Sequence, residues 1–455
     1  MLEGSGGWRD QLPHAGVEIV SSPPADLAVG PAGATGAAAA ARTPAIILEG
    51  RTRASVPGYA TRRFVLLPSL EDPFLVIPLD RQRVAAYALK TWLFPTSLAG
   101  AARRWLGVRL PGPALTLSRR AQIAVLTRGA AQPLLVAEAA KRFDFGPQPD
   151  WFVVCGQGDV LARGLFVVFG AGQRQPEWIV KFARVPDYSE PFERDEAALS
   201  MVARVGGAAS AHAPRLLGRF TVAGHHAAVE TAAAGSRLSG VLQSRAPRAE
   251  KLRVLEAVAA WIVQVGVETS GGRASAAVEV ERLRAETIPT RGDVDPGISD
   301  CLDQLPAVLQ HNDLGGWNVV VNRAAGFTAV DWESARSQGL PLWDLWYFLA
   351  HTLVQLDGFD GDPVDGFRRL FRGEAPSSAL LFRWTREAAQ ALDLPAETLG
   401  PLATLCWLHH SRSGGARAVA LEGRGGEAKS WPAARFIDVW LADPALGASW
   451  SRWQR

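Results

Sequence analysis

The segment 311–333 constrains this chain of 455 residues more than any other part of its sequence. It places two short apolar runs on either side of the turn 323–326, which ends in glycine. Apolar runs of this length around such a turn predict an antiparallel β-hairpin. Symmetric pairing about the turn puts Asn318 opposite Asp331, and Asp313 lies on the loop just before the hairpin. We therefore expect one amide and two carboxylates to converge at the open end of the hairpin.

The expected arrangement suits a magnesium ion. Directly opposed residues in an antiparallel ladder have Cβ atoms roughly 4.5–5.5 Å apart, so the side chains of Asn318 and Asp331 should lie close together. Mg²⁺ prefers hard oxygen ligands, takes one or two protein carboxylates and leaves its other positions to water and phosphate. Asn318 and Asp331 are therefore candidate metal ligands.

The pattern His311-x-Asp313-x-x-x-x-Asn318, followed by Asp331 in an Asp-Trp-Glu setting, resembles the catalytic centre of the protein-kinase-like superfamily. The resemblance is to its aminoglycoside phosphotransferase and choline-kinase branch. It implies that Asp313 accepts the proton of the acceptor hydroxyl and that Asn318 and Asp331 bind Mg²⁺. Asn312 stands where this branch commonly has glycine. We expect His311 to pack against the loop or hydrogen-bond to it, and not to act as a base.

A lysine in an apolar run is the second candidate. Lys181 lies within the strand-like run 178–183, where a solvated charge is not expected, so an inward-pointing lysine there needs an anion. The resemblance implies that Lys181 contacts the α- and β-phosphates of ATP and is held by Glu196 on the following helix. Glu193, one turn earlier, is a possible substitute for Glu196. A lysine that extends to solvent at a strand edge is the alternative.

Composition and periodicity divide the chain into four parts. Residues 1–45 are rich in Gly, Ala and Pro and have little to bury, which predicts a tail or linker. Residues 46–149 predict an accessory α+β region of unknown role. The resemblance implies that residues 150–232 form a small antiparallel β N-lobe and residues 233–455 a mainly helical C-lobe. The expected fold is therefore α+β, bilobal and protein-kinase-like, with an extra N-terminal region.

Three further positions follow from the resemblance. Glu230 and Ala232 lie where this family has the inter-lobe hinge, whose backbone binds adenine. Either of the Gly-containing turns 156–158 and 170–174 corresponds to the loop that covers the nucleotide phosphates. Asp344 lies in apolar surroundings and should be paired; the resemblance makes it a buried brace for the backbone of the catalytic loop.

The spacing after Asp331 indicates the class of acceptor. A protein kinase has a long segment after its metal-binding Asp, ending in an Ala-Pro-Glu element. Here only twelve residues separate Asp331 from Asp344, and no such element follows. The acceptor is therefore expected to be a small molecule, such as an aminoglycoside, an aminoalcohol or a sugar. The four Asp residues within 357–365 either attract a cationic acceptor or form a solvated acidic loop.

Composition excludes several other classes. Formal net charge is +3, with acids and bases nearly balanced, so there is no nucleic-acid footprint. The three cysteines fit no zinc spacing, and no apolar run is long enough to span a membrane. The beginning of the sequence does not read as a signal peptide. We expect a soluble cytoplasmic phosphotransferase that uses ATP and Mg²⁺, of unknown oligomeric state; the alternative is a nucleotide-binding pseudokinase that acts as a scaffold without turnover.

Overall fold

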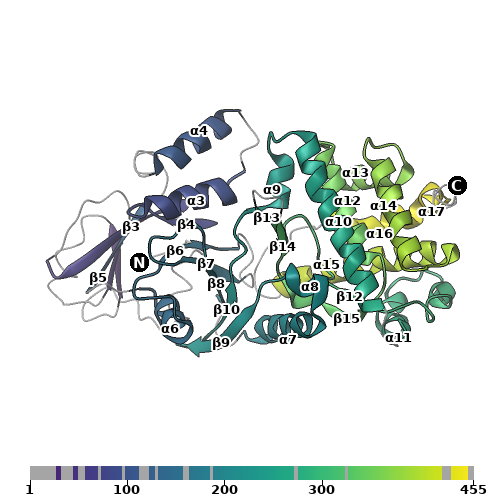
Figure 1. Ribbon diagram of the computed structural model, residues 1–455, viewed down its shortest axis with the longest axis horizontal. Coiled ribbons are helices and arrows are strands. Elements are labelled where there is room, and N and C mark those ends of the chain that lie inside the picture. Colours follow the sequence, from purple (N-terminus) through teal and green to yellow (C-terminus); the bar gives the residue numbers. More distant parts are fainter. Residues whose placement is uncertain are drawn as a thin grey trace. The chain divides into compact units, whose positions relative to one another are not determined.

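The computed structural model describes twelve stretches of the chain: 27–31, 45–49, 57–69, 73–94, 98–111, 122–128, 132–156, 163–184, 188–270, 275–322, 326–422 and 432–448. The chain divides into two compact units (Figure 1). We call residues 1–193 with 215–234 the β-rich unit, and residues 194–214 with 235–455 the helical unit. The expected α+β fold class, with one antiparallel sheet unit and one mainly helical unit, is confirmed.

The β-rich unit is built on one ten-stranded sheet in the order β1-β2-β5-β3-β4-β6-β7-β8-β10-β9. Every neighbouring pair is antiparallel except β1 and β2, which run parallel. The strands are β1 (Leu27–Pro31), β2 (Ala45–Glu49), β3 (Tyr59–Leu67), β4 (Leu75–Pro78), β5 (Gln122–Arg128), β6 (Asp150–Val154), β7 (Gly164–Phe169), β8 (Trp178–Phe182), β9 (Leu216–Val222) and β10 (His225–Thr231).

Helices cover both faces of the central strands. On one face, β-strand residues such as Val65 and Phe169 pack with α3 (Gln82–Trp92). On the other face, their sequence neighbours, such as Phe64 and Val168, pack with α6 (Leu134–Phe143). Because successive side chains on a strand point to opposite faces, strands buried on both sides are apolar throughout. The helix α4 (Leu98–Arg109) completes this unit.

The sheet differs from the division expected at residue 150. β4 pairs with β6, with Leu75 opposite Val154, so strands from 46–149 and from 150–232 belong to one sheet. β4 pairs with the edge of β6, and α3 and α6 cover the two faces of the sheet. All three elements come from the region before residue 150. Within the segment interpreted as a tail, residues 27–31 form β1.

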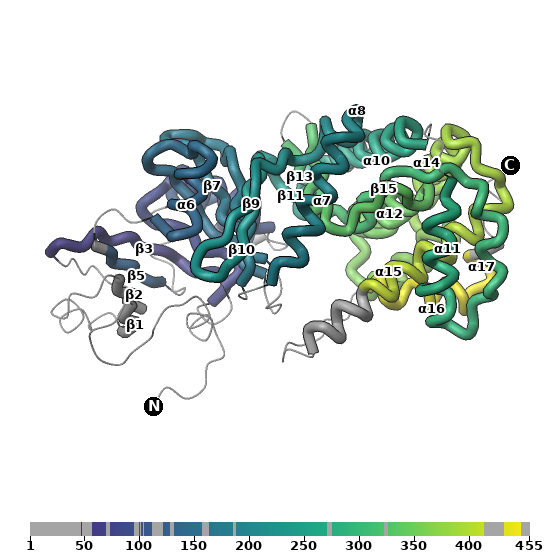
Figure 2. Tube along the Cα trace, turned by 90° about the horizontal axis from the view of Figure 1, so that it is seen from below, coloured from purple at the N-terminus to yellow at the C-terminus, as the bar shows by residue number. Residues whose placement is uncertain are grey.

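The helical unit contains most of the remaining secondary structure (Figure 2). Its helices are α7 (Glu190–Val205, which begins in the β-rich unit), α8 (Gly207–Ala211), α9 (Leu238–Gln243), α10 (Arg248–Ser270), α11 (Ala277–Glu286), α12 (Trp343–Leu356), α13 (Pro363–Arg372), α14 (Ser378–Ala391), α15 (Leu399–Glu422), α16 (Phe436–Ala442) and α17 (Pro444–Ala448). Its short strands are β11 (Ser236–Arg237), β12 (Val308–Gln310), β13 (Val319–Val321), β14 (Phe327–Ala329) and β15 (Arg336–Gly339). Among the described residues, no helix has the length and apolar character to cross a membrane.

Helix α12 lies at the centre of the helical unit. Ten of its fourteen residues are buried, including the large side chains of Trp343, Trp346 and Phe348. A helix that is apolar on nearly all sides must be surrounded by other elements. Polar groups on α12, such as Asp344, are therefore held in fixed positions by the packing around them.

The hairpin between β13 and β14 is confirmed, but its predicted register was wrong by one residue. Val319 pairs with Ala329. The N–H of Asn322 donates to the carbonyl of Gly326 at 2.9 Å, and the N–H of Gly326 donates to Oδ1 of Asn322 at 3.1 Å. Asn322 and Gly326 thus close the turn between them, and residues 323–325 lie outside the described part of the chain.

This shift changes what lies opposite Asn318. The N–H of Val330 donates to the carbonyl of Asn318 at 2.8 Å, so Val330 takes the place expected for Asp331. Asp331 follows in the left-handed backbone conformation, with φ of 69°. The direction of the Asp331 side chain is therefore set by its own backbone conformation and not by the pairing of β13 with β14.

Candidate active site

One buried carboxylate holds the backbone of the loop between β12 and β13. Oδ2 of Asp344 accepts the N–H of His311 at 2.6 Å, and Oδ1 accepts the N–H of Asn312 at 2.7 Å. Burial raises the pKa of Asp344 to about 6, while the two N–H groups act in the opposite direction. Asp344 is therefore paired as expected, and it braces the loop.

Asn312 has a backbone conformation that suits glycine, the residue commonly found at this position in the branch that the sequence resembles. Asn312 has φ of 69°, in the left-handed region. Glycine adopts this region freely, and asparagine tolerates it better than most other residues. The substitution therefore keeps the shape of the loop.

His311 links the loop to the segment that carries Asp331. Its Nε2 lies 3.0 Å from the carbonyl of Val330, and its ring packs on Trp332 at a centroid distance of 4.6 Å. Burial lowers the pKa of His311 to about 4, so its ring is neutral at physiological pH. His311 was expected to pack against the loop or hydrogen-bond to it; its ring does pack and hydrogen-bond, but with the segment that carries Asp331.

Both oxygens of the Asp313 carboxylate are held. Nδ2 of Asn318 donates to Oδ2 of Asp313 at 2.9 Å and also to the Asp313 carbonyl at 2.9 Å, and the hydroxyl of Tyr347 donates to Oδ1 at 3.2 Å. Burial and the negative charge of Asp331 raise the pKa of Asp313 to about 7, although the two side-chain hydrogen bonds oppose the rise. The carboxylate is thus oriented and lies within electrostatic range of Asp331.

The donor groups fit a magnesium ion. Since Nδ2 of Asn318 is used by Asp313, its Oδ1 is left as an acceptor, and no described residue donates a hydrogen bond to it. Asp331 adds a second hard oxygen donor, and a divalent cation would offset the repulsion between Asp313 and Asp331. No group of three or more His, Cys, Asp or Glu among the described residues is placed to hold a metal. A magnesium ion here would therefore depend on the amide of Asn318 and the carboxylate of Asp331, with water and phosphate oxygens as its other ligands.

Two residues near this loop were missed by the sequence analysis. Tyr347 lies one turn after Asp344 on α12, so both reach the loop from the same face of the helix, and this i, i+3 spacing is the signal that was available. Burial raises the pKa of Tyr347 well above 10, so it remains a hydrogen-bond donor. Arg237 on β11 interacts electrostatically with Asp331, and its pKa is lowered by burial. No sequence pattern singled out Arg237.

In the β-rich unit, Lys181 forms a buried ion pair. Its Nζ lies 2.5 Å from Oε1 of Glu230, and the two side chains are 8% and 3% exposed. Lys181 is on β8 and Glu230 is on the neighbouring strand β10. The alternative of a lysine that extends to solvent is therefore wrong. Glu196 lies on α7 in the helical unit, and its role as a partner of Lys181 stays a prediction.

The structure also restricts how the expected hinge can bind adenine. The N–H of Ala232 donates to the carbonyl of Glu177 at 2.9 Å, so only the carbonyl of Ala232 is available to a ligand.

Of the two Gly-containing turns, residues 157–158 lie outside the described part of the chain. The turn 170–174 is closed by a hydrogen bond of 3.0 Å from the N–H of Gln173 to the carbonyl of Gly170.

The four Asp residues within 357–365 mostly serve the fold. Asp357 pairs with Arg248 at 3.0 Å, and Asp362 accepts the N–H of Val364 at the start of α13. Asp365 pairs with Arg368 at 2.6 Å. Within the described residues, only Asp360 has no such partner, so this group is not a prepared site for a cation.

Acid should destabilise the helical unit through its buried histidines. Burial lowers the pKa of His351 to about 4 and that of His409 to about 3. An unfolded histidine has a pKa of about 6.5, so below that pH the unfolded chain binds protons that the folded chain does not. The contribution of these histidines to stability is therefore constant above pH 6.5 and falls as the pH drops toward 4, with His351 alone accounting for roughly 3 kcal/mol at pH 4. Asp313 and Asp344, whose pKa values are raised, contribute in the opposite direction, so the histidine contribution is isolated by comparison with a His351 variant. Urea unfolding at pH 7.5 and at pH 4.5 measures this loss.

A variant separates His351 from the other acid-sensitive groups. His351→Gln should show a smaller loss of stability between the two pH values than the parent protein. His226→Gln, on β10 in the β-rich unit, is the matched control and should keep the parent loss. Equal losses in His351→Gln and the parent protein would contradict the prediction.

Comparisons with known proteins give similarities to solved structures. No protein-family model matches the chain, and no curated protein does. The chain is similar to an aminoglycoside-3'-phosphotransferase of type VIII, with 18% identity, a TM-score of 0.37, and coverage of 61% of this chain and 99% of that chain. It is similar to the aminoglycoside phosphotransferase APH(3'')-Id from Streptomyces rimosus in complex with ADP and streptomycin, with 14% identity, a TM-score of 0.35, and coverage of 58% and 93%. It is also similar to the bifunctional kinase-methyltransferase WbdD, with 14% identity, a TM-score of 0.31, and coverage of 83% and 70%.

Proposed function

We propose that this protein transfers the γ-phosphate of ATP to a hydroxyl of a small molecule, such as an aminoglycoside, an aminoalcohol or a sugar. The Asp313 carboxylate is the observation that carries the proposal. It is held at both oxygens, on a loop whose backbone is braced by Asp344, and it lies within electrostatic range of Asp331. Phosphoryl transfer depends mainly on positioning and charge stabilisation, which such an arrangement supplies.

The residues of the helical unit have distinct roles in this proposal. Asp313 positions the acceptor hydroxyl and accepts its proton, while the hydrogen bonds from Asn318 and Tyr347 keep the carboxylate in one orientation. Asn318 and Asp331 hold Mg²⁺, which when bound neutralises charge on the phosphates. Asp344 does not touch substrate; it positions the loop.

The residues of the β-rich unit bind the nucleotide in this proposal. Lys181 contacts the phosphates, and its ion pair with Glu230 holds its ammonium in place; Glu196 is proposed to support the same lysine. The hinge at Glu230 and Ala232 binds adenine through its backbone, with the carbonyl of Ala232 as the available acceptor. Because the Lys181 side chain is nearly buried, it is preorganised and loses little side-chain freedom on binding.

Mg·ATP is expected to raise the melting temperature of the protein. A ligand that binds only the folded state stabilises it by about 2.7 kcal/mol at a hundred times its Kd. Lys181→Ala and Asp331→Ala should each remove most of this shift, measured by thermal unfolding with and without millimolar Mg·ATP. Lys141→Ala is the matched control, because Lys141 is an exposed lysine on α6. The absence of a shift in the parent protein would count against any kinase-like activity.

An acceptor screen then tests turnover. ATP consumption is measured with aminoglycosides, aminoalcohols and sugars, each with and without the protein. Acceptor-dependent release of ADP supports the proposed reaction. Binding of Mg·ATP without turnover on any acceptor would favour the alternative of a pseudokinase that acts as a scaffold.

A further inference from the structure

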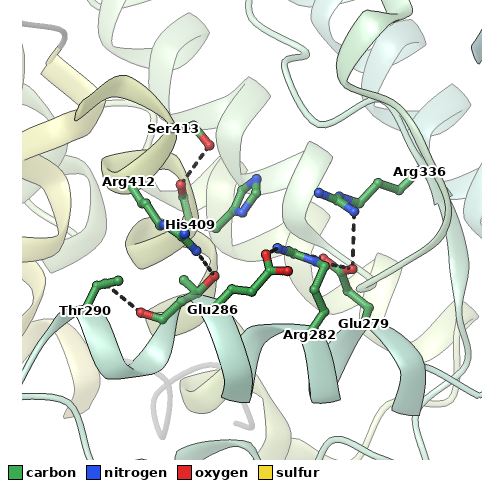
Figure 3. A network of polar contacts seen from close by, with 9 residues as sticks. Glu279, Arg282, Glu286, Thr290, Arg336, His409, Arg412 and Ser413 are labelled. Atoms are coloured by element: carbon green, nitrogen blue, oxygen red, sulfur yellow. Dashed lines mark hydrogen bonds and ion pairs between the residues drawn. The ribbon is translucent and has the colours of Figure 1, made fainter. Parts of the chain in front are cut away.

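Three arginines and a histidine from three elements meet in the helical unit (Figure 3). Arg282 comes from α11, Arg336 from β15, and His409 and Arg412 from α15. None of these residues belongs to the loop that carries Asp313. Figure 3 shows the guanidinium groups grouped around the ring of His409.

Of the three arginines, only Arg282 has its positive charge balanced by hydrogen-bonded carboxylates. Arg282 makes two hydrogen bonds to Glu279, at 2.9 Å and 2.6 Å, and one to Glu286 at 3.1 Å. These bonds raise its pKa. The charge of Arg282 is therefore satisfied within the protein, and the two glutamates are largely used by it.

The other two arginines have no carboxylate within hydrogen-bonding distance among the described residues. Nη1 of Arg336 lies 3.7 Å from Oε2 of Glu279, too far for a hydrogen bond, and its Nε is buried without a hydrogen-bond partner. Arg412 donates from Nη1 to the neutral hydroxyl of Thr287 at 3.2 Å. The side chain of Arg336 is 37% exposed, so solvent-borne ions can reach it.

His409 between them is buried but not hydrogen-bonded through its ring. The residue is 8% exposed, and no described residue bonds its ring nitrogens. Burial, together with the positive charges of Arg282, Arg336 and Arg412, lowers the pKa of His409 to about 3. The ring is thus a neutral N–H donor beside three guanidinium groups that share two carboxylates, with Glu279, at 3.7 Å, as the ion-pair partner of Arg336. Buried polar groups normally find partners, so the unpartnered Nε of Arg336 beside the His409 ring indicates a ligand.

We propose that Arg336, Arg412 and His409 form a binding site for a small oxyanion, the phosphate or carboxylate group of a small molecule. Guanidinium groups suit this ligand because their planar forks donate two parallel hydrogen bonds to such groups. The negative charge of the ligand would balance the positive charge that Glu279 and Glu286 leave uncompensated. The site is independent of the proposed phosphotransfer.

The test measures the melting temperature in inorganic phosphate, sulfate, acetate and chloride at equal ionic strength, without Mg²⁺ or nucleotide. The parent protein should be stabilised by an oxyanion relative to chloride. Arg336→Gln and Arg412→Gln should each weaken binding at least tenfold in a calorimetric titration with phosphate. Stabilisation by phosphate and sulfate alone would assign the site to a tetrahedral group, and stabilisation by acetate as well would extend it to carboxylates.

Two controls make the result specific. Arg368→Gln removes an exposed arginine on α13 and should bind phosphate like the parent protein. Lys181→Ala should also keep phosphate binding, because Lys181 belongs to the proposed nucleotide site.

The proposal would be overturned by equal stabilisation in chloride, by unchanged binding in both Arg336→Gln and Arg412→Gln, or by loss of binding in Lys181→Ala alone. Arg336→Lys adds a check on folding: it keeps the charge but not the fork, so weaker phosphate binding by a folded protein supports the site.

Discussion

Asp313→Asn is expected to lower turnover on a confirmed acceptor about 10²–10⁴-fold, while Mg·ATP binding stays nearly intact. Asparagine has almost the shape of aspartate, and its oxygen can still accept the hydrogen bond that Asn318 donates at 2.9 Å. It cannot accept a proton from the acceptor hydroxyl. The loss should therefore fall on the chemical step, as measured by steady-state turnover together with the thermal shift in Mg·ATP.

Comparing Asp313→Asn with Asp331→Ala distinguishes the role of the proposed base from that of the proposed metal ligand. Removing the proposed metal ligand should damage nucleotide binding and turnover together, whereas Asp313→Asn should damage turnover alone. Asp360→Asn is the matched control, because Asp360 is exposed and lies outside the loop. If Asp313→Asn turned over at the parent rate, Asp313 would not be the base and the assignment of the whole loop would have to be withdrawn.

Asp344→Ala is expected to destabilise the protein by about 1–3 kcal/mol net, because it leaves two buried N–H groups without acceptors. These are the N–H groups of His311 and Asn312, at 2.6 Å and 2.7 Å from the carboxylate. Removing the carboxylate also relieves the unfavourable burial that raises its pKa to about 6. Two unpaired buried donors outweigh this relief, at about 1–3 kcal/mol each. Urea unfolding at pH 7.5 measures the change.

Asp344→Asn refines this result. Its amide keeps one acceptor oxygen, so the loss of stability should lie between those of the parent protein and Asp344→Ala. Turnover should fall in both variants, since the loop that carries Asp313 loses its brace. Asp360→Ala serves as the control. A stability of Asp344→Ala within about 0.5 kcal/mol of the parent value, the range of an ordinary surface change, would show that Asp344 does not hold the loop.

The sequence by itself determined the elements whose signals are local. The run 178–183 predicted a strand because it is apolar over the length of a strand, and the turn 323–326 predicted a hairpin. It also indicated that Asp344, a charged residue in apolar surroundings, needs partners, because an unpaired buried charge is too unfavourable to persist. These inferences depend on a few neighbouring residues and the character of their surroundings.

Only the tertiary structure decided which distant groups meet. Lys181 is paired with Glu230 because β8 and β10 are neighbours in the sheet although other elements separate them in sequence. Tyr347 reaches Asp313 because α12 packs against the loop that carries Asp313. The hairpin register differs by one residue from the expected one because Asn322 pairs with Gly326. The sheet also extends across residue 150, because β6 pairs with β4 from the preceding region. Amino-acid composition does not predict which strand is the partner. Such contacts depend on the order of strands and the packing of helices, which residue spacing does not encode.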